Sequence, residues 1–346
     1  MFRILKAWCA RRVASAKRKV VAWFRRAKPV ARGRWLSGEY RESAGQLTFA
    51  PLVSTARRFW LYFPADYQAT EHLPLLVMLH GCKQDAKTFA AGTLMNVLAD
   101  KQRFLVLYPE QQRLANMYRC WNWFDPSSHE GNGEAAIVAG MVRALVPKYQ
   151  IDPTRIYVAG MSAGGAIASV LASCYADLFA ACAVHSGLMF RAASSAALAL
   201  NVMHHGSDID PAVAAQSAFD LPGHKVADMP MMVIHGDKDR TVDPLNAEQI
   251  VAQFTALNRL MANAANTVFD ETQREENIAP NGKQYGYRVR NHGVAERLRI
   301  REVSIQSLAH AWTGGNASYP YNDSRGPDAT ELLWSFFKLH RREQAG

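Results

Sequence analysis

The chain of 346 residues is 49% hydrophobic and 20% charged, a composition typical of a folded globular protein rather than a disordered one. No run of 18 uncharged apolar residues occurs, which excludes a membrane-spanning helix. The net charge of +10 comes from residues 1–38, which carry twelve Lys or Arg and no acidic residue. The remaining chain is nearly neutral, with 28 basic and 30 acidic residues, so we expect no nucleic-acid partner.

Residues 1–26 are predicted to form a basic amphipathic helix, because apolar side chains recur every three or four residues and Lys and Arg occupy the other faces. Charged residues interrupt every apolar run, so the segment does not resemble a secretory signal peptide. Such a helix would bind an anionic membrane or a polymer-granule surface. A solvated basic extension, or a start codon assigned too far upstream, explains the same pattern.

From about Gln46 onward, short apolar stretches alternate with helical ones, including helices at 134–149 and 163–173. This alternation predicts an α/β fold with a doubly wound, mainly parallel sheet of about eight strands. We divide the chain into a basic segment (1–34), a linker (35–45) and an α/β domain (46–342). An edge or antiparallel strand is expected at 58–63, a last strand at 300–307, and buried parallel strands at 75–79, 104–108, 156–159, 181–184 and 231–234.

The strand at 156–159 runs directly into Gly160-Met161-Ser162-Ala163-Gly164, which opens a helix. A G-x-S-x-G sequence between strand and helix predicts a nucleophile elbow. Ser162 would then stand at a helix N-terminus, where free N–H groups and the helix dipole favour negative charge. The alternative is a tight turn in which Ser162 is only the N-cap of the helix. The strand and helix on either side favour the catalytic interpretation.

Two backbone donors are predicted for the oxyanion that acyl transfer generates. In this architecture one donor is the residue after the nucleophile, here Ala163. The other comes from the loop after the third strand, which reads His80-Gly81-Cys82 and indicates the N–H of Cys82. We expect His80 to brace this loop rather than to act as a base, because it precedes the nucleophile in the chain.

The acid of the triad should lie downstream of the nucleophile, because the fold orders its triad as Ser, then Asp or Glu, then His. The strand at 231–234 leads into a loop with three aspartates, Asp237, Asp239 and Asp243. Asp239 lies far enough past the turn for its carboxylate to return over the sheet edge, so we predict it as the acid. We expect Asp237 to hold an Asx turn and Asp243 to cap the next helix.

Three histidines follow the aspartate loop, namely His292, His310 and His340. His292 lies in a polar turn, and His340 lies in a charged helix end where we expect solvent exposure. His310 follows the last strand in a glycine-rich loop, which would let its imidazole reach Ser162. We predict His310 as the base that takes the Ser162 proton, with Asp239 fixing its tautomer.

These segments together resemble the polyhydroxybutyrate (PHB) depolymerase family of esterases, which also includes feruloyl and acetylxylan esterases. The similar stretches are Leu79–Gln84, Tyr108–Gln111, Cys120–Phe124, Ile151–Val158, Gly160–Gly165, His185–Gly187, His235–Asp239 and His310–Trp312. The resemblance implies an α/β-hydrolase fold, the triad Ser162, Asp239 and His310, and a substrate that is a polyester, an oligomer or a small acyl ester. It also implies that Cys82 and Cys120 approach one another, as in secreted relatives.

The expected activity is that of a serine carboxylic-ester hydrolase acting on PHB-type oligomers or short-chain acyl esters. A feruloyl or acetylxylan esterase, a peptidase or acyltransferase on the same fold, and a surface-binding protein carried by residues 1–26 are the alternatives. No P-loop, dinucleotide or metal-ligand pattern occurs, so we expect no cofactor and no metal. We expect a location in the cytoplasm or on a granule or membrane surface, with an extracellular one as the alternative.

Four further residues are candidates for substrate binding. Trp121, Trp123 and Trp312 could line an acyl or aromatic pocket, although tryptophan more often serves as core packing. Ser186 follows the strand at 181–184 and could line the cleft, or it could be an ordinary turn residue.

Overall fold

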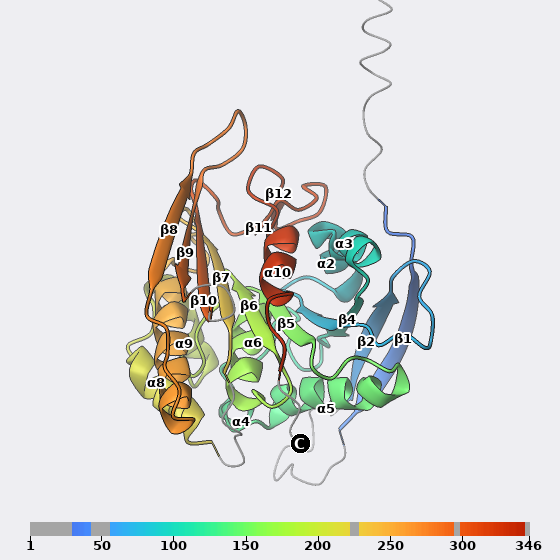
Figure 1. The fold of residues 1–346 in the computed structure, drawn as a ribbon, viewed down its shortest axis with the longest axis horizontal. Helices are drawn as coiled ribbons and strands as arrows, with labels where there is room; N and C mark the ends of the chain where they lie inside the picture. Colours follow the sequence, from blue (N-terminus) through green and yellow to red (C-terminus); the bar gives the residue numbers. More distant parts are fainter. Residues whose placement is uncertain (1–29, 43–55, 222–227, 294–297, 343–346) are drawn as a thin grey trace, which may run out of the picture.

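The computed structural model describes residues 30–42, 56–221, 228–293 and 298–342. Ten strands form one twisted sheet in the order β1-β2-β4-β3-β5-β6-β7-β10-β9-β8, which crosses Figure 1 from β1 at the right to β8 at the left. The strands are β1 (Arg34–Arg41), β2 (Ala56–Phe63), β3 (Leu75–Leu79), β4 (Leu105–Glu110), β5 (Ile156–Met161), β6 (Ala181–His185), β7 (Met231–Gly236), β8 (Gln273–Ile278), β9 (Tyr287–His292) and β10 (Ile300–Ile305). A separate pair consists of β11 (Trp312–Thr313) and β12 (Asn322–Asp323).

The six central strands, β4 to β10 in sheet order, are parallel. Alternate residues of one strand face opposite sides, so Leu75, Val77 and Leu79 enter one hydrophobic core while Leu76 and Met78 enter the other. Burial on both faces explains why these strands are continuously apolar in the sequence.

Helices cover both faces of the sheet. One core lies against α5 (Gly133–Lys148), α6 (Ala163–Cys174), α7 (Ala196–His205), α8 (Pro211–Phe219) and α9 (Leu245–Ala264). The other lies against α2 (Ala86–Thr93), α3 (Met95–Gln102) and α10 (Ala329–Phe337), and the short α4 (Pro126–His129) contacts α5 and α6. The doubly wound α/β prediction is confirmed.

The edges of the sheet differ from the prediction, which gave about eight strands and a linker at residues 35–45. Arg34–Arg41 form β1, paired antiparallel with β2, so the linker prediction is wrong over this stretch. Leu36 and Tyr40 pack against the core from this edge strand. At the opposite edge β8 and β9 form an antiparallel hairpin, in which the side chains of β8 are mostly exposed and those of β9 are half-buried. The predicted helix at residues 1–26 lies outside the described residues.

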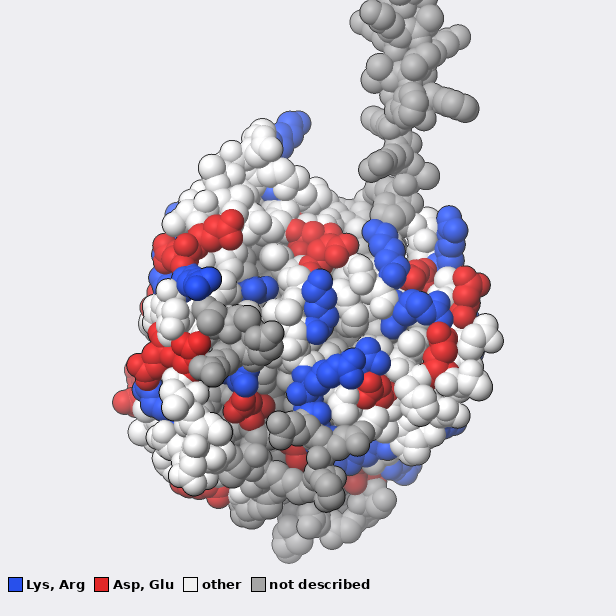
Figure 2. All heavy atoms as spheres, in the orientation of Figure 1, with Lys and Arg blue, Asp and Glu red and all other residues white. Residues whose placement is uncertain are grey.

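The face drawn in Figure 2 is electrostatically mixed, as the nearly neutral composition predicts. Figure 2 shows Lys and Arg interspersed with Asp and Glu across the visible face. In the described part of the chain, no helix has both the length and the apolarity needed to cross a bilayer.

Candidate active site

Ser162 lies at the sharp turn between β5 and α6, as the elbow prediction requires. Its backbone has φ 57° and ψ −125°, a strained conformation for a residue with a side chain. Flanking glycines make the turn possible, because a Cβ at Gly160 would lie 2.1 Å from the Gly164 carbonyl oxygen, and one at Gly164 would lie 2.0 Å from that of Leu79. The Ser162 side chain makes no capping hydrogen bond, which argues against the alternative of a simple N-cap.

The loop after β3 lies against this turn. A Cβ built on Gly81 would lie 3.4 Å from Cβ of Ser162, so the two loops are in contact. Ala163 is the first residue of α6, and its N–H is one of the donors that a helix leaves free. Within the described residues, the N–H of Cys82 donates to no acceptor. Both predicted oxyanion donors therefore belong to segments that adjoin the nucleophile.

His80 braces this loop, as predicted. Its Nδ1 lies 2.8 Å from the carbonyl oxygen of Gly81, and its Nε2 accepts a hydrogen bond of 3.2 Å from the Gln111 N–H. The side chain is fully buried, and burial lowers its pKa, so the ring is neutral and serves as a fixed donor and acceptor.

Asp239 and His310, which were predicted to be the acid and the base, lie in direct contact. Nδ1 of His310 lies 2.7 Å from Oδ2 of Asp239, while Oδ1 accepts from the N–H groups of Thr241 and Val242 at 2.9 Å each. Burial alone would raise the pKa of Asp239. The hydrogen bond from His310 and the electrostatic attraction of its ring, with the Val242 N–H, outweigh burial and lower that pKa to about 2. Asp239 is therefore a carboxylate at any working pH, and it holds the proton of His310 on Nδ1.

The competing aspartates bond backbone N–H groups rather than a histidine, and the Asx turn predicted for Asp237 is wrong. The Asp237 carboxylate accepts from the Ser307 N–H at 2.7 Å and so ties the acid loop to the end of β10. The Asp243 carboxylate accepts from the Leu245 N–H at the start of α9. His340, in contrast, is buried against Phe336 rather than exposed, and burial lowers its pKa to about 3.

The chain matches the sequence model of a known esterase family. The sequence model of the family described as "Esterase PHB depolymerase" matches residues 58–279, well over half of the chain. The chain belongs to this family.

Its relatives include "Poly(3-hydroxyalkanoate) depolymerase C" of Paucimonas lemoignei, 35% identical over 207 residues that cover 56% of this chain and 49% of the relative. "Probable acetylxylan esterase A" of Aspergillus clavatus is 29% identical over 217 residues, which cover 60% of this chain and 69% of the relative. The chain thus spans about half the length of the depolymerase it matches. The solved acetyl xylan esterase of Aspergillus awamori has the same fold, with a TM-score of 0.65 at 19% identity over 82% of this chain and 94% of that one.

In this PHB depolymerase family member, Cys82 and Cys120 are joined by a disulfide that closes a loop of 38 residues. The bond ties the candidate oxyanion loop to the segment before α4. Cross-links of this span typically stabilise a fold by about 2–4 kcal/mol. Cys174 and Cys182 are free, and burial raises their pKa, which leaves both thiols protonated and unreactive.

The residues predicted to bind substrate are buried. Trp121, Trp312 and Ser186 are at most 1% exposed and Trp123 is 3% exposed, so the structure corrects the prediction of direct substrate contact. Trp312 stacks on the ring of His185 with centroids 5.1 Å apart. Trp121 likewise lies beside the ring of His80, with centroids 5.8 Å apart.

Sequence reasoning missed two buried histidines beneath the triad. His235 places Nε2 at 2.8 Å from the Val242 carbonyl oxygen and 3.5 Å from Oδ2 of Asp239. His185 accepts at Nε2 from the Thr313 N–H, and burial lowers its pKa to about 3. His185 ends β6 and His235 lies next to the end of β7. The sequence indicated these strand ends as the place of the site. These two rings hold the loops around Val242 and Thr313 by hydrogen bonds to the backbone.

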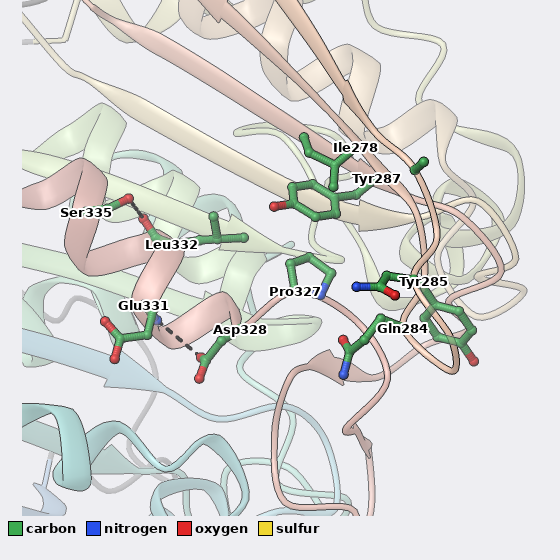
Figure 3. A pocket seen from close by; sticks show the side chains of 11 residues that line it. Ile278, Gln284, Tyr285, Tyr287, Pro327, Asp328, Glu331, Leu332 and Ser335 are labelled. Carbon is green, nitrogen blue, oxygen red and sulfur yellow. Dashed lines mark hydrogen bonds between the residues drawn. The ribbon is translucent and has the colours of Figure 1, made fainter.

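A hollow of about 490 Å³ lies apart from these residues, between the β8–β9 hairpin and the start of α10 (Figure 3). Tyr287, Pro327 and Leu332 form its apolar wall. The Asp328 carboxylate at its rim caps α10 by accepting from the N–H groups of Thr330 and Glu331. None of the predicted site residues lines this hollow.

Proposed function

We propose that the protein is a serine carboxylic-ester hydrolase with Ser162, Asp239 and His310 as its triad. The observation that carries the proposal is the short hydrogen bond between His310 and the ionised Asp239, formed at the sheet edge where the strained Ser162 turn also lies. Catalysis explains this arrangement better than a structural role does. It combines a buried carboxylate, a partly exposed imidazole and a serine that does not cap its helix.

In this mechanism His310 accepts the Ser162 proton at Nε2 while the serine Oγ bonds to the ester carbonyl carbon. The oxyanion accepts hydrogen bonds from the N–H groups of Cys82 and Ala163. The bond to the leaving alkoxide then breaks, and His310 returns the proton to that alkoxide. Water repeats the sequence on the acyl-enzyme and releases the acid. No step requires a cofactor.

The substrates we propose are polyhydroxyalkanoate oligomers and short-chain acyl esters. The similarity to a poly(3-hydroxyalkanoate) depolymerase, at 35% identity, supports this choice. A feruloyl or acetylxylan ester is the second candidate, supported by the 29% identity to a probable acetylxylan esterase. Turnover of p-nitrophenyl butyrate in competition with amorphous PHB, 3-hydroxybutyrate oligomers, methyl ferulate and acetylated xylan distinguishes them. We expect the 3-hydroxybutyrate oligomers to compete most strongly. Stronger competition by methyl ferulate or acetylated xylan would make the second candidate the preferred substrate class.

Surface attachment through the basic residues 1–26 is the second part of the proposal. Deleting residues 1–29 spares the strand β1, which begins at Arg34, and the preceding N–H of Gly33, which donates to the Tyr62 hydroxyl. We expect unchanged turnover of p-nitrophenyl butyrate but loss of salt-sensitive binding to vesicles containing phosphatidylserine and to PHB granules. Co-sedimentation at low and high salt measures this binding. Equal binding by the full and shortened chains would disprove the role of the segment.

The disulfide between Cys82 and Cys120 bears on location. Disulfides persist mainly in oxidising compartments, so the bond favours the extracellular alternative over the cytoplasm.

A further inference from the structure

A buried polar cluster lies beneath the candidate oxyanion loop. Arg57 on β2 and Glu134 on α5 form an ion pair of 3.1 Å, with side chains 1% and 8% exposed. Gln111, at the end of β4, joins them: its Oε1 accepts from Nε of Arg57 at 2.9 Å, and its Nε2 donates to Glu134. Burying two charges is costly, and one such pair rarely stabilises a fold more than apolar residues would. A cluster of this kind invites a functional explanation.

The cluster reaches the loop by two routes that start from Gln111. Its backbone N–H donates to Nε2 of His80, and Nδ1 of the same ring bonds the Gly81 carbonyl group. Its carboxamide Nε2 donates at 3.0 Å to the carbonyl oxygen of Cys120, which is covalently bonded to Cys82 through the disulfide. Gln111 therefore contacts His80, which lies two residues before the candidate oxyanion donor Cys82, and Cys120, which is joined to Cys82 by the disulfide.

Glu134 fixes the segment around Cys120 from the other side. Its Oε2 accepts from the Asn122 N–H at 2.7 Å, and its Oε1 accepts from the Asn122 side chain at 3.0 Å. Earlier in the same segment, the Tyr118 carbonyl oxygen accepts from the Lys83 N–H at 2.7 Å. The segment thus holds the loop by a hydrogen bond beside Cys82 as well as by the disulfide.

We propose that Gln111, together with Glu134 and Arg57, is a positioning cluster that fixes the Cys82 N–H toward the oxyanion. This inference rests on the proposed ester hydrolysis at Ser162. The side chains of Gln111 and Glu134 act through Cys120 and Asn122, and the backbone N–H of Gln111 acts through His80. An oxyanion hole works because its donors are held in place before the reaction, and a misplacement of about 1 Å can cost about 10²-fold in rate.

The test is Gln111→Met, which keeps the volume of the side chain and removes the side-chain hydrogen bonds to Arg57, Glu134 and Cys120, while the backbone N–H to His80 stays. Gln253→Met is the matched control, because Gln253 is also fully buried and its carboxamide bonds the backbone of Phe190 instead. We expect Gln111→Met to lower kcat for p-nitrophenyl butyrate by about 10- to 100-fold with KM within about twofold. The affinity for an alkyl trifluoromethyl ketone, whose hemiketal oxyanion needs the same donors, should fall by a similar factor.

Gln253→Met should leave kcat, KM and ketone affinity near the wild-type values when both variants are assayed well below their melting temperatures. Wild-type kcat in Gln111→Met, or equal losses in both variants, would overturn the inference while leaving the hydrolase assignment intact. An inactive wild-type protein would refute the proposed function and this inference with it.

If Gln111→Met does not fold, a second variant provides the test. The double change Cys82→Ala with Cys120→Ala keeps the Cys82 backbone N–H and removes its covalent link to the cluster. We expect the same loss of kcat and of ketone affinity with little change in KM. Unchanged kcat in this folded variant would equally overturn the positioning role.

Discussion

Ser162→Ala should lower kcat for p-nitrophenyl butyrate by roughly 10⁶-fold, because it removes the atom that forms the acyl-enzyme. The side chain makes no capping hydrogen bond, so the fold should lose little stability. Initial rates under saturating substrate, with thermal unfolding measured alongside, give both quantities.

Ser169→Ala is the matched control for this change. Ser169 lies on the same helix α6, is fully buried, and its hydroxyl bonds only the Gly165 carbonyl group within the described residues. We expect activity near that of the wild type. Residual activity in Ser162→Ala within tenfold of the wild type would place the nucleophile elsewhere.

Asp239→Asn should lower kcat by about 10⁴-fold, the loss that the corresponding change causes in a serine protease. The N–H groups of Thr241 and Val242 both donate to Oδ1, so the asparagine oxygen should keep that position. Its NH₂ group would then face Nδ1 of His310 and donate to it. The ring would carry its proton on Nε2, where it cannot accept the proton of Ser162. The measurement is kcat across a pH range.

Asp237→Asn is the control for Asp239→Asn, because it removes a negative charge from the same loop without changing the orientation of His310. Asp237 lies in the same loop, and its carboxylate bonds the Ser307 N–H rather than a histidine. We expect only a small change in kcat. Similar losses in the two variants would mean that loop structure, and not the tautomer of His310, sets the rate.

The central fold and the nucleophile turn were predictable because their signals are local. A continuously apolar strand followed by Gly160 and Gly164 specifies the turn within nine residues of sequence. Asp239 and His310 could be ranked because the fold fixes their order along the chain. Their contact of 2.7 Å joins residues 71 apart, which no local pattern could supply.

The missed elements depend on long-range pairing. The strand β1 is mostly polar, and only its pairing with β2 and the burial of Leu36 and Tyr40 make it a strand. The side chains of β8 are mostly exposed, and the hairpin that it forms with β9 is likewise ordered by the pairing of β9 with β10. Exposed edges carry no apolar alternation, so these strands resembled loops in the sequence.

The buried polar residues were missed for a related reason. Arg57 occurs beside Arg58 in the sequence, yet Arg57 is fully buried while Arg58 is exposed. Its partners Gln111 and Glu134 lie 54 and 77 residues away. The three tryptophans were predicted to contact substrate, and they are buried. Their position near the site in the sequence does not show whether their side chains are exposed.

The most direct test is to trap the acyl-enzyme. Wild-type protein mixed with p-nitrophenyl butyrate, quenched in acid within the burst and digested, should carry one butyryl group on the peptide that contains Ser162, and fragmentation should locate it on that serine. The wild-type protein should release p-nitrophenol in a burst equal to the amount of butyrylated peptide. Ester turnover with the butyryl group on another residue, or with no acylated peptide under conditions that trap a control serine esterase, would contradict the mechanism.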